Sequence, residues 1–277
     1  MTFRAALSAA GHRLRGLSTA RQDAELLLRR VVARDRAWVI AHPDDELMPE
    51  QARQFESWIA RRERNEPIQY ITGEAEFYGL PFRVTPDVLI PRPETEHLVE
   101  KVLSLAGLFT APRIVDVGAG SGAIAIALAH ALPRACITAT DISSRALAIA
   151  EQNAKRNSVA LCFIEGDLLA PVANERFEFV VSNPPYVPEI DRAALSVEVR
   201  DYEPALALFA GDDGLEVYRR LIPAAFDALT PGGFLVLEIG FGQSTAIAEM
   251  LARAGFEQIE FVPDLKDIPR VACARRP

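Results

Sequence analysis

From Ile114 onward, short apolar runs alternate with segments of helical periodicity. Because parallel strands need a crossover connection, this alternation predicts an α/β fold with a mostly parallel, doubly wound sheet. Only residues 263–270 separate the last two expected strands, which is too short for a helical crossover, so these strands should pair antiparallel. The expected strands are residues 114–117, 136–140, 161–164, 177–181, 234–239, 256–262 and 271–274, and the expected helices are residues 123–132, 144–157, 215–229 and 243–254.

The part before this alternation divides into a helical region and a connector. Residues 1–66 have helical periodicity, with a possible capping box at Thr19 and Gln22 and a proline, Pro49, at the start of a later helix. Residues 67–93 predict a small hairpin with strands at 70–72, 76–78 and 80–84, followed by a stiff proline-rich stretch. The expected domains are therefore 1–66, a connector at 67–93, and a sheet domain at 94–277.

Charge and composition exclude several kinds of protein. The 277 residues carry a net charge of −8, which does not suit a large nucleic-acid interface. Residues 151–250 hold 16 acidic and 7 basic side chains, so a basic protein segment is a better partner for that half than a phosphate backbone. No apolar run reaches the ~18 residues of a membrane span. The histidines and cysteines form no ligand-spaced cluster, so we expect no metal site.

A glycine-rich motif lies between the first strand of the alternating region and its first helix. Glycines at this position let a ligand approach the backbone, and the helix N-terminus offers unpaired N–H groups. The spacing also satisfies the dinucleotide-binding pattern, so the motif alone leaves the ligand open. Its candidate ligand-binding residues are Asp116, Gly118, Ala119, Gly120, Ser121 and Gly122.

Two acidic positions follow the next two strands. Asp141 ends the second strand, where a carboxylate accepts hydrogen bonds from ribose hydroxyls. Asp167 and Leu168 follow the third strand, where the carboxylate could accept from an adenine amine while the leucine packs on the ring. Together with the glycine motif, these residues predict a nucleoside-containing ligand.

The sequence Ser182-Asn183-Pro184-Pro185-Tyr186 follows the fourth strand, at the sheet edge where open α/β sheets bind ligands. Prolines lack an N–H group and fix the backbone, so the Asn183 side-chain oxygen and the Pro184 carbonyl can both accept from a substrate –NH2. Tyr186 offers a flat face over a planar group. Asn183, Pro184 and Tyr186 are the candidate catalytic residues, and Asn183, Pro184, Pro185 and Tyr186 are the candidate substrate-binding residues.

This motif with the upstream glycine loop resembles class I S-adenosylmethionine-dependent methyltransferases that act on planar nitrogens. Further stretches resemble the HemK/PrmC family over about residues 20–275. They are residues 66–73, 76–80, 88–96, 153–157, 231–233 and 237–240. The family often has a glycine near residues 264–270, where this chain has Lys266 and Asp267, so we expect the local shape of that loop to differ from the family's.

The resemblance implies the class I methyltransferase fold, preceded by a helical domain that recognises the substrate. It implies an enzyme that uses S-adenosyl-L-methionine to methylate N5 of the glutamine in the Gly-Gly-Gln motif of class-1 peptide chain release factors. Under it, Asn183 also belongs to the cofactor site. It further implies a monomeric protein of the bacterial cytoplasm, without stable nucleic-acid or membrane partners.

Four alternatives share part of this pattern. A nicotinamide dehydrogenase would share the glycine loop and Asp141 but would not need residues 183–186. A DNA or RNA N6-adenine methyltransferase would share all the motifs but should add a basic, aromatic-rich recognition region. A ribosomal-protein glutamine methyltransferase differs around residues 92–96, which here resemble the release-factor enzyme. A non-catalytic S-adenosylmethionine-binding protein would bind the ligand without methyl transfer.

Overall fold

A computed structural model describes all 277 residues and divides the chain into two compact units. The first unit contains Met1–Gly73 together with a short insertion, Ser196–Tyr202. The second unit contains Glu74–Leu195 and Glu203–Pro277. No helix in either unit has the length and hydrophobicity that crossing a membrane would require.

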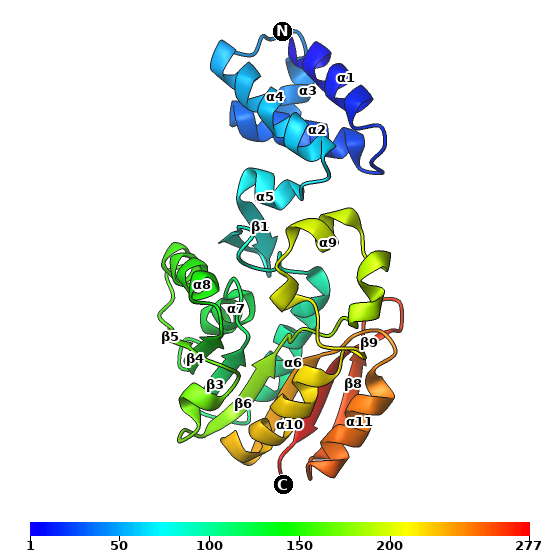
Figure 1. Cartoon of the computed structure of the whole chain (residues 1–277). Helices are drawn as coiled ribbons and strands as arrows, with labels where there is room; N and C mark the ends of the chain where they lie inside the picture. The colour runs from blue at the N-terminus through cyan, green and yellow to red at the C-terminus, as the bar shows by residue number, and fades with distance from the viewer. The chain divides into compact units, whose positions relative to one another are not determined.

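The first unit is entirely helical (Figure 1). Its helices are α1 (Phe3–Arg13), α2 (Ala20–Val32), α3 (Arg36–Ala41), α4 (Pro49–Glu63), α5 (Ile68–Thr72) and α9 (Val197–Tyr202). Helices α1 to α5 enclose one apolar core, in which Leu27, Leu28 and Ile59 are almost fully buried. A buried ion pair adds to it, because the Arg62 Nε donates to Asp23 at 2.7 Å and Arg62 Nη2 donates to Glu198 of α9 at 2.6 Å.

Two local predictions for this region are wrong. The Thr19 hydroxyl caps no backbone N–H but donates to the Asp23 carboxylate at 2.8 Å, so the expected capping box does not form. Residues 70–72 are not a strand but part of α5, which follows Pro67 and ends at Gly73 in the left-handed conformation (φ 75°). A five-residue helix contains too few turns to show helical periodicity in the sequence.

The second unit contains a two-stranded hairpin and a seven-stranded sheet. The hairpin consists of β1 (Glu74–Phe77) and β2 (Leu80–Arg83), which pair antiparallel as predicted. The sheet has the order β5-β4-β3-β6-β7-β9-β8, and all its pairs are parallel except those of β9. Its strands are β3 (Arg113–Val117), β4 (Cys136–Asp141), β5 (Cys162–Glu165), β6 (Phe177–Ser182), β7 (Leu229–Glu238), β8 (Glu257–Pro263) and β9 (Pro269–Arg275).

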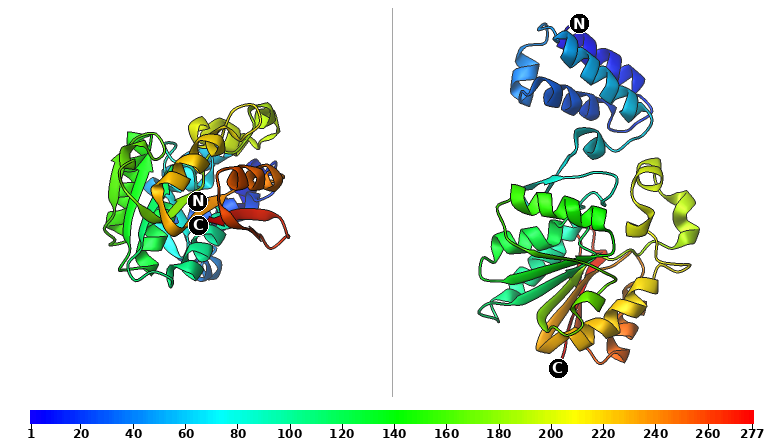
Figure 2. Two further views of the ribbon diagram at one scale, coloured as in Figure 1. Left: turned by 90° about the horizontal axis from the view of Figure 1, so that it is seen from below. Right: turned by 60° about the vertical axis from the view of Figure 1, so that its left-hand side comes forward.

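The predicted doubly wound α/β fold with an antiparallel last strand is therefore confirmed. Helices cover both faces of the sheet (Figure 2). One face packs against α6 (Glu96–Ala106), α7 (Ala123–Ala131) and α8 (Ser144–Arg156), and the other packs against α10 (Glu216–Ala228) and α11 (Ser244–Arg253). Because strand side chains alternate between faces, neighbours such as Val180 and Val181 belong to separate apolar clusters. The remaining turns are 3₁₀ segments at Pro93–Thr95, Ala170–Val172, Glu189–Ala194 and Ala205–Ala207.

Candidate functional site

The glycine loop connects the carboxyl end of β3 with α7. Gly118, Gly120 and Gly122 all have positive φ, at 74°, 55° and 81°, which favours glycine over other residues. A Cβ atom on Gly122 would lie 3.0 Å from Ile126 and 3.1 Å from Ala150, so this glycine lets the two helices α7 and α8 approach. Nothing lies within 4 Å of a Cβ position on Gly118 or Gly120. The backbone of the loop is therefore open at Gly118 and Gly120 and closely packed at Gly122.

Asp141, at the end of β4, holds this loop in place. One carboxylate oxygen accepts from the Gly120 N–H and the other from the Ser143 N–H, both at 2.8 Å. Burial raises the pKa of Asp141, and these backbone donors oppose that shift. No ion pair involves Asp141, and a carboxylate offers about four acceptor positions, so capacity remains for hydroxyl donors of a ligand.

Asp116 lies beneath the same loop and is completely buried. Its Oδ2 accepts from the Ala125 N–H at 3.0 Å, whereas its Oδ1 is buried with no hydrogen-bond partner in the protein. Burial raises the pKa of Asp116 to about 7. Buried polar atoms are usually hydrogen-bonded, so Oδ1 is an acceptor that a bridging water or a ligand could satisfy.

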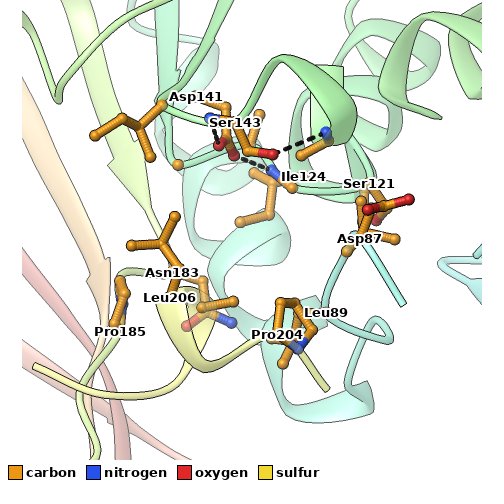
Figure 3. A pocket seen from close by; sticks show the side chains of 18 of the residues that line it. Asp87, Leu89, Ser121, Ile124, Asp141, Ser143, Asn183, Pro185, Pro204 and Leu206 are labelled. Carbon is orange, nitrogen blue, oxygen red and sulfur yellow. Dashed lines mark hydrogen bonds between the residues drawn. The ribbon is translucent and has the colours of Figure 1, made fainter. Parts of the chain in front are cut away.

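A cavity of about 360 Å³ opens in front of the loop, within the usual range for a small-molecule site (Figure 3). The predicted residues that line it come from four different strand ends. They are Gly118, Ala119, Gly120, Ser121, Asp141, Asp167, Leu168, Asn183 and Pro185. Asp116, Gly122, Pro184 and Tyr186 do not line it. The structure thus brings together most of the sequence-predicted residues, and no group of His, Cys, Asp or Glu is arranged to hold a metal ion.

The cations of the cavity wall are all paired with carboxylates. Arg145 lies 3.4 Å from Asp87, Arg92 pairs with Glu203 at 2.5 Å, and Arg220 pairs with the predicted adenine-binding residue Asp167. Leu168 beside it packs against the apolar cluster that includes α10. Asp141 is therefore the one acidic side chain of the wall whose charge no arginine balances.

The Asn-Pro-Pro-Tyr segment leaves the carboxyl end of β6 beside β3. The Ser182 hydroxyl donates to the Val117 carbonyl at 2.6 Å and so ties the two strand ends together. The Asn183 Nδ2 donates to the Thr95 hydroxyl oxygen at 3.1 Å, and Asn183 lies beside Pro185 and Leu206 in the cavity (Figure 3). Pro184, between Asn183 and Pro185 in the sequence motif, is buried.

Tyr186 is held by the end of β7. Its hydroxyl donates to Glu238 Oε1 at 3.3 Å, and its ring packs against the α10 side of the sheet. Glu238 itself is buried, and this burial raises its pKa to about 7, opposed by the hydrogen bonds from Thr95 and Tyr186.

Several cavity residues were not predicted. The stretch from Pro86 to Arg92 was interpreted as a stiff connector, yet it forms one wall. Residues 204–209 form another, although no element was expected there. Ser143 could have been found, since it follows Asp141 at a strand end. Asn153 is fully buried, and its Nδ2 donates to the carbonyls of Ser121 and Arg83 at 2.9 and 3.0 Å, which joins the glycine loop to the hairpin.

Comparison with known proteins gives two family-model matches. Residues 5–73 match the PrmC N-terminal domain, and residues 94–198 match the methyltransferase small domain. A release factor glutamine methyltransferase from Geobacter sulfurreducens is 43% identical over 94% of this chain and 91% of its own length. One from Koribacter versatilis is 42% identical over 100% of this chain and 99% of its own length.

Among solved structures, a 16S rRNA N2 G1207 methyltransferase of Thermus thermophilus, in complex with AdoMet and guanosine, matches with a TM-score of 0.55. The match is 18% identical and covers 74% of this chain and 50% of that one. At this identity the likeness concerns the fold alone, and it agrees with the sheet order and helical layers of the second unit.

Proposed function

Because the chain belongs to the family of release factor glutamine methyltransferases, we propose that it methylates N5 of the glutamine in the Gly-Gly-Gln motif of class-1 peptide chain release factors, with S-adenosyl-L-methionine as the methyl donor. The observation that carries this proposal is the placement of Asn183. Its side chain lies in the cavity at a strand end, with its nitrogen already bonded to Thr95 and its oxygen available to a substrate.

The residues around the glycine loop fit this donor. The open tips of Gly118 and Gly120 leave room for a ligand against the backbone, and Asp141 retains acceptor capacity for ribose hydroxyls. The unbalanced charge of Asp141 also suits a ligand that carries a sulfonium cation. When bound, S-adenosylmethionine supplies an electrophilic methyl group. Asp167 could accept from the adenine amine only if it shares its carboxylate with Arg220 or releases it.

The chemical task of the chain's own residues is to position a weak nucleophile. An amide nitrogen is a poor nucleophile because its lone pair is delocalised. The Asn183 oxygen and the backbone carbonyl of Pro184 would accept its two hydrogens and thereby orient it; Pro184 itself is buried and does not line the cavity, so only its carbonyl would have to face the substrate. The same two dipoles would stabilise the positive charge that develops on nitrogen as the new N–C bond forms. No side chain with the geometry of a general base is needed if the amide proton leaves late to water.

Tyr186 and Pro185 complete the proposed substrate site. Pro185 lines the cavity directly. The Tyr186 ring does not line the cavity; its hydrogen bond to Glu238 fixes it and it packs partly inside the protein, so its role would be to support the backbone of the motif.

Substrate recognition outside the cavity would use charge. The acidic excess of residues 151–250 favours a protein substrate with basic residues around its glutamine. We further propose that the helical unit contacts a remote part of the release factor, as expected for a match to the PrmC N-terminal domain.

The test is incubation of the enzyme with labelled S-adenosylmethionine and, in parallel, a release factor, a ribosomal-protein fraction and DNA or RNA oligonucleotides. We expect mass spectrometry to find one added methyl group on the Gly-Gly-Gln glutamine. A release factor whose glutamine is replaced by asparagine is the matched control and should stay unlabelled. Label confined to ribosomal protein or to adenine would overturn the proposal and support the corresponding alternative. Binding of the donor without transfer to any acceptor would indicate a non-catalytic protein.

A further inference from the structure

Thr95 stands at the start of α6 but does not serve that helix. A threonine at a helix N-terminus normally accepts a hydrogen bond from a backbone N–H of the first turn. The Thr95 side chain makes no such bond. It is buried, with a relative exposure of 4%, and its hydroxyl oxygen instead lies 2.6 Å from Glu238 Oε2 and 3.1 Å from Asn183 Nδ2. The Thr95 side chain therefore hydrogen-bonds to Glu238 and to the cavity residue Asn183, and it does not cap the helix.

The polarity of this chain of hydrogen bonds follows from counting protons. Burial raises the pKa of Glu238 to about 7, so above that pH its side chain is an ionised carboxylate, which can only accept, and the single hydroxyl proton of Thr95 goes to Glu238. The Thr95 oxygen can then only accept from Asn183. An asparagine amide has one donor end and one acceptor end, so the end that faces Thr95 must be its nitrogen. The Asn183 oxygen therefore points away from Thr95.

Glu238 is itself held in one position. Its second oxygen accepts from the Tyr186 hydroxyl at 3.3 Å, and its backbone carbonyl accepts from the buried Tyr218 hydroxyl at 2.8 Å. Both side-chain oxygens of Glu238 are thus used by hydroxyl donors. Burial strengthens such a network electrostatically, because the local dielectric constant is low.

We propose that Thr95, fixed by Glu238, is a positioning residue for methyl transfer that selects the amide orientation in which the Asn183 oxygen faces the substrate. This inference rests on the proposed function, since it assumes that Asn183 accepts from the methylated amide. Without Thr95, the Asn183 amide could turn over and present its NH2 group to the substrate NH2 group. Two donors would then face each other, and the nucleophile would lose one of its two acceptors.

The experiment compares Thr95→Val, which keeps the shape but removes the hydroxyl, with Thr95→Ser, which keeps the hydroxyl. Single-turnover methylation is measured with saturating donor and release factor at a pH well above the raised pKa of Glu238, so that its carboxylate is ionised, and donor affinity is measured by calorimetry at the same pH. We expect Thr95→Val to lower the rate about 10- to 100-fold. The dissociation constant of the donor for Thr95→Val should stay within about twofold of the wild-type value. Thr95→Ser, which keeps the hydroxyl, should methylate at a rate within about threefold of wild type.

A double-mutant cycle separates positioning from a merely structural role. In an Asn183→Ala background there is no amide to orient, so Thr95→Val should change the remaining rate less than about twofold. A rate for Thr95→Val within threefold of wild type would overturn the inference. So would an equal loss in the Asn183→Ala background, because Thr95 would then act independently of Asn183.

Two provisions keep this test decisive. Thermal unfolding checks each variant, and Thr95→Ala replaces Thr95→Val in the same comparisons if the valine variant does not fold. Failure of the proposed function is seen separately, as absence of release-factor methylation by the wild type. In that case the same ratios of rates apply to whichever amino group the wild type does methylate.

Discussion

Replacement of Asp141 by asparagine tests the centre of the cofactor site, because this side chain does two tasks at once. Its two oxygens each accept one backbone N–H, from Gly120 and from Ser143, at 2.8 Å. Asparagine has the same size but only one acceptor end. Whichever way the new amide turns, one of these two N–H groups faces another donor.

The size of the effect follows from these contacts. Loss of one hydrogen bond to a charged acceptor costs about 1.5–3 kcal/mol, and this should appear as a lower unfolding free energy of the protein without ligand. Under the proposed function, the ribose hydroxyls also lose their charged acceptor. That loss should weaken S-adenosylmethionine binding by about 1–3 kcal/mol, which corresponds to about 5- to 150-fold in the dissociation constant.

Denaturant unfolding and calorimetric titration measure these two effects separately. Asp87→Asn is the matched control, because Asp87 lines the same cavity but pairs with Arg145 at 3.4 Å and accepts no hydrogen bond from the glycine loop. We expect the control to change neither quantity by much. An Asp141→Asn protein that binds the donor within twofold of wild type would refute the ribose role. An equal loss of affinity in Asp87→Asn would mean that cavity charge, and not this contact, determines binding.

Three further predictions concern other residues. Asn183→Ala should lower the single-turnover methylation rate about 10²–10³-fold with little change in donor affinity, and near-normal chemistry would remove this residue from the mechanism. Burial raises the pKa of Asp116 to about 7, above its unfolded value, so the contribution of Asp116 to the unfolding free energy should fall as pH rises from about 4 to 7. Asp116→Asn should remove that part of the slope in denaturant titrations across this range, and an unchanged slope would contradict the buried ionisable state. Arg62→Met should cost about 3–5 kcal/mol of stability, since it leaves Asp23 buried without its cation, and replacing Asp23 by leucine as well should restore much of it.

The sheet domain could be predicted because its pattern is repetitive. Seven apolar runs, with helical segments in four of the six gaps between them, have few alternative arrangements once crossovers must be right-handed and connections short. The antiparallel pairing of β8 with β9 follows the same logic, because the short connection at residues 263–270 allows no crossover. The place of β9 between β7 and β8 was not predicted, since a short connection fits either order. The helix at Ile68–Thr72 was missed for the opposite reason. It is too short to show a period, and the following glycines were interpreted as hairpin turns.

The site was predicted well where a motif ends a strand and poorly where a loop returns from elsewhere. Gly120, Asp141 and Asn183 were found because the carboxyl ends of parallel strands meet at one edge. The wall formed by residues 204–209 carries no such signature. Its position depends on backbone pairing of Val187 with Leu208 and Ala210, which no local pattern encodes. The hydrogen bond between Thr95 and Glu238 could not be predicted either, because the two residues lie 143 positions apart in the sequence and no local pattern links them.

The glycine loop is shaped by the protein before any ligand arrives. Asp141 holds the Gly120 N–H, Asp116 holds the Ala125 N–H at the start of α7, and Asn153 holds the Ser121 carbonyl. These three side chains come from different elements, and each is largely buried, so the conformational entropy of ordering the loop is lost during folding. A ligand therefore need not supply that free energy when it binds, which is the physical basis of preorganisation. The same reasoning applies to Asn183, whose side-chain amide is fixed by the buried Thr95. In the methyl-donor half and in the methyl-acceptor half of the proposed site alike, buried side chains fix the polar groups that would contact the ligand.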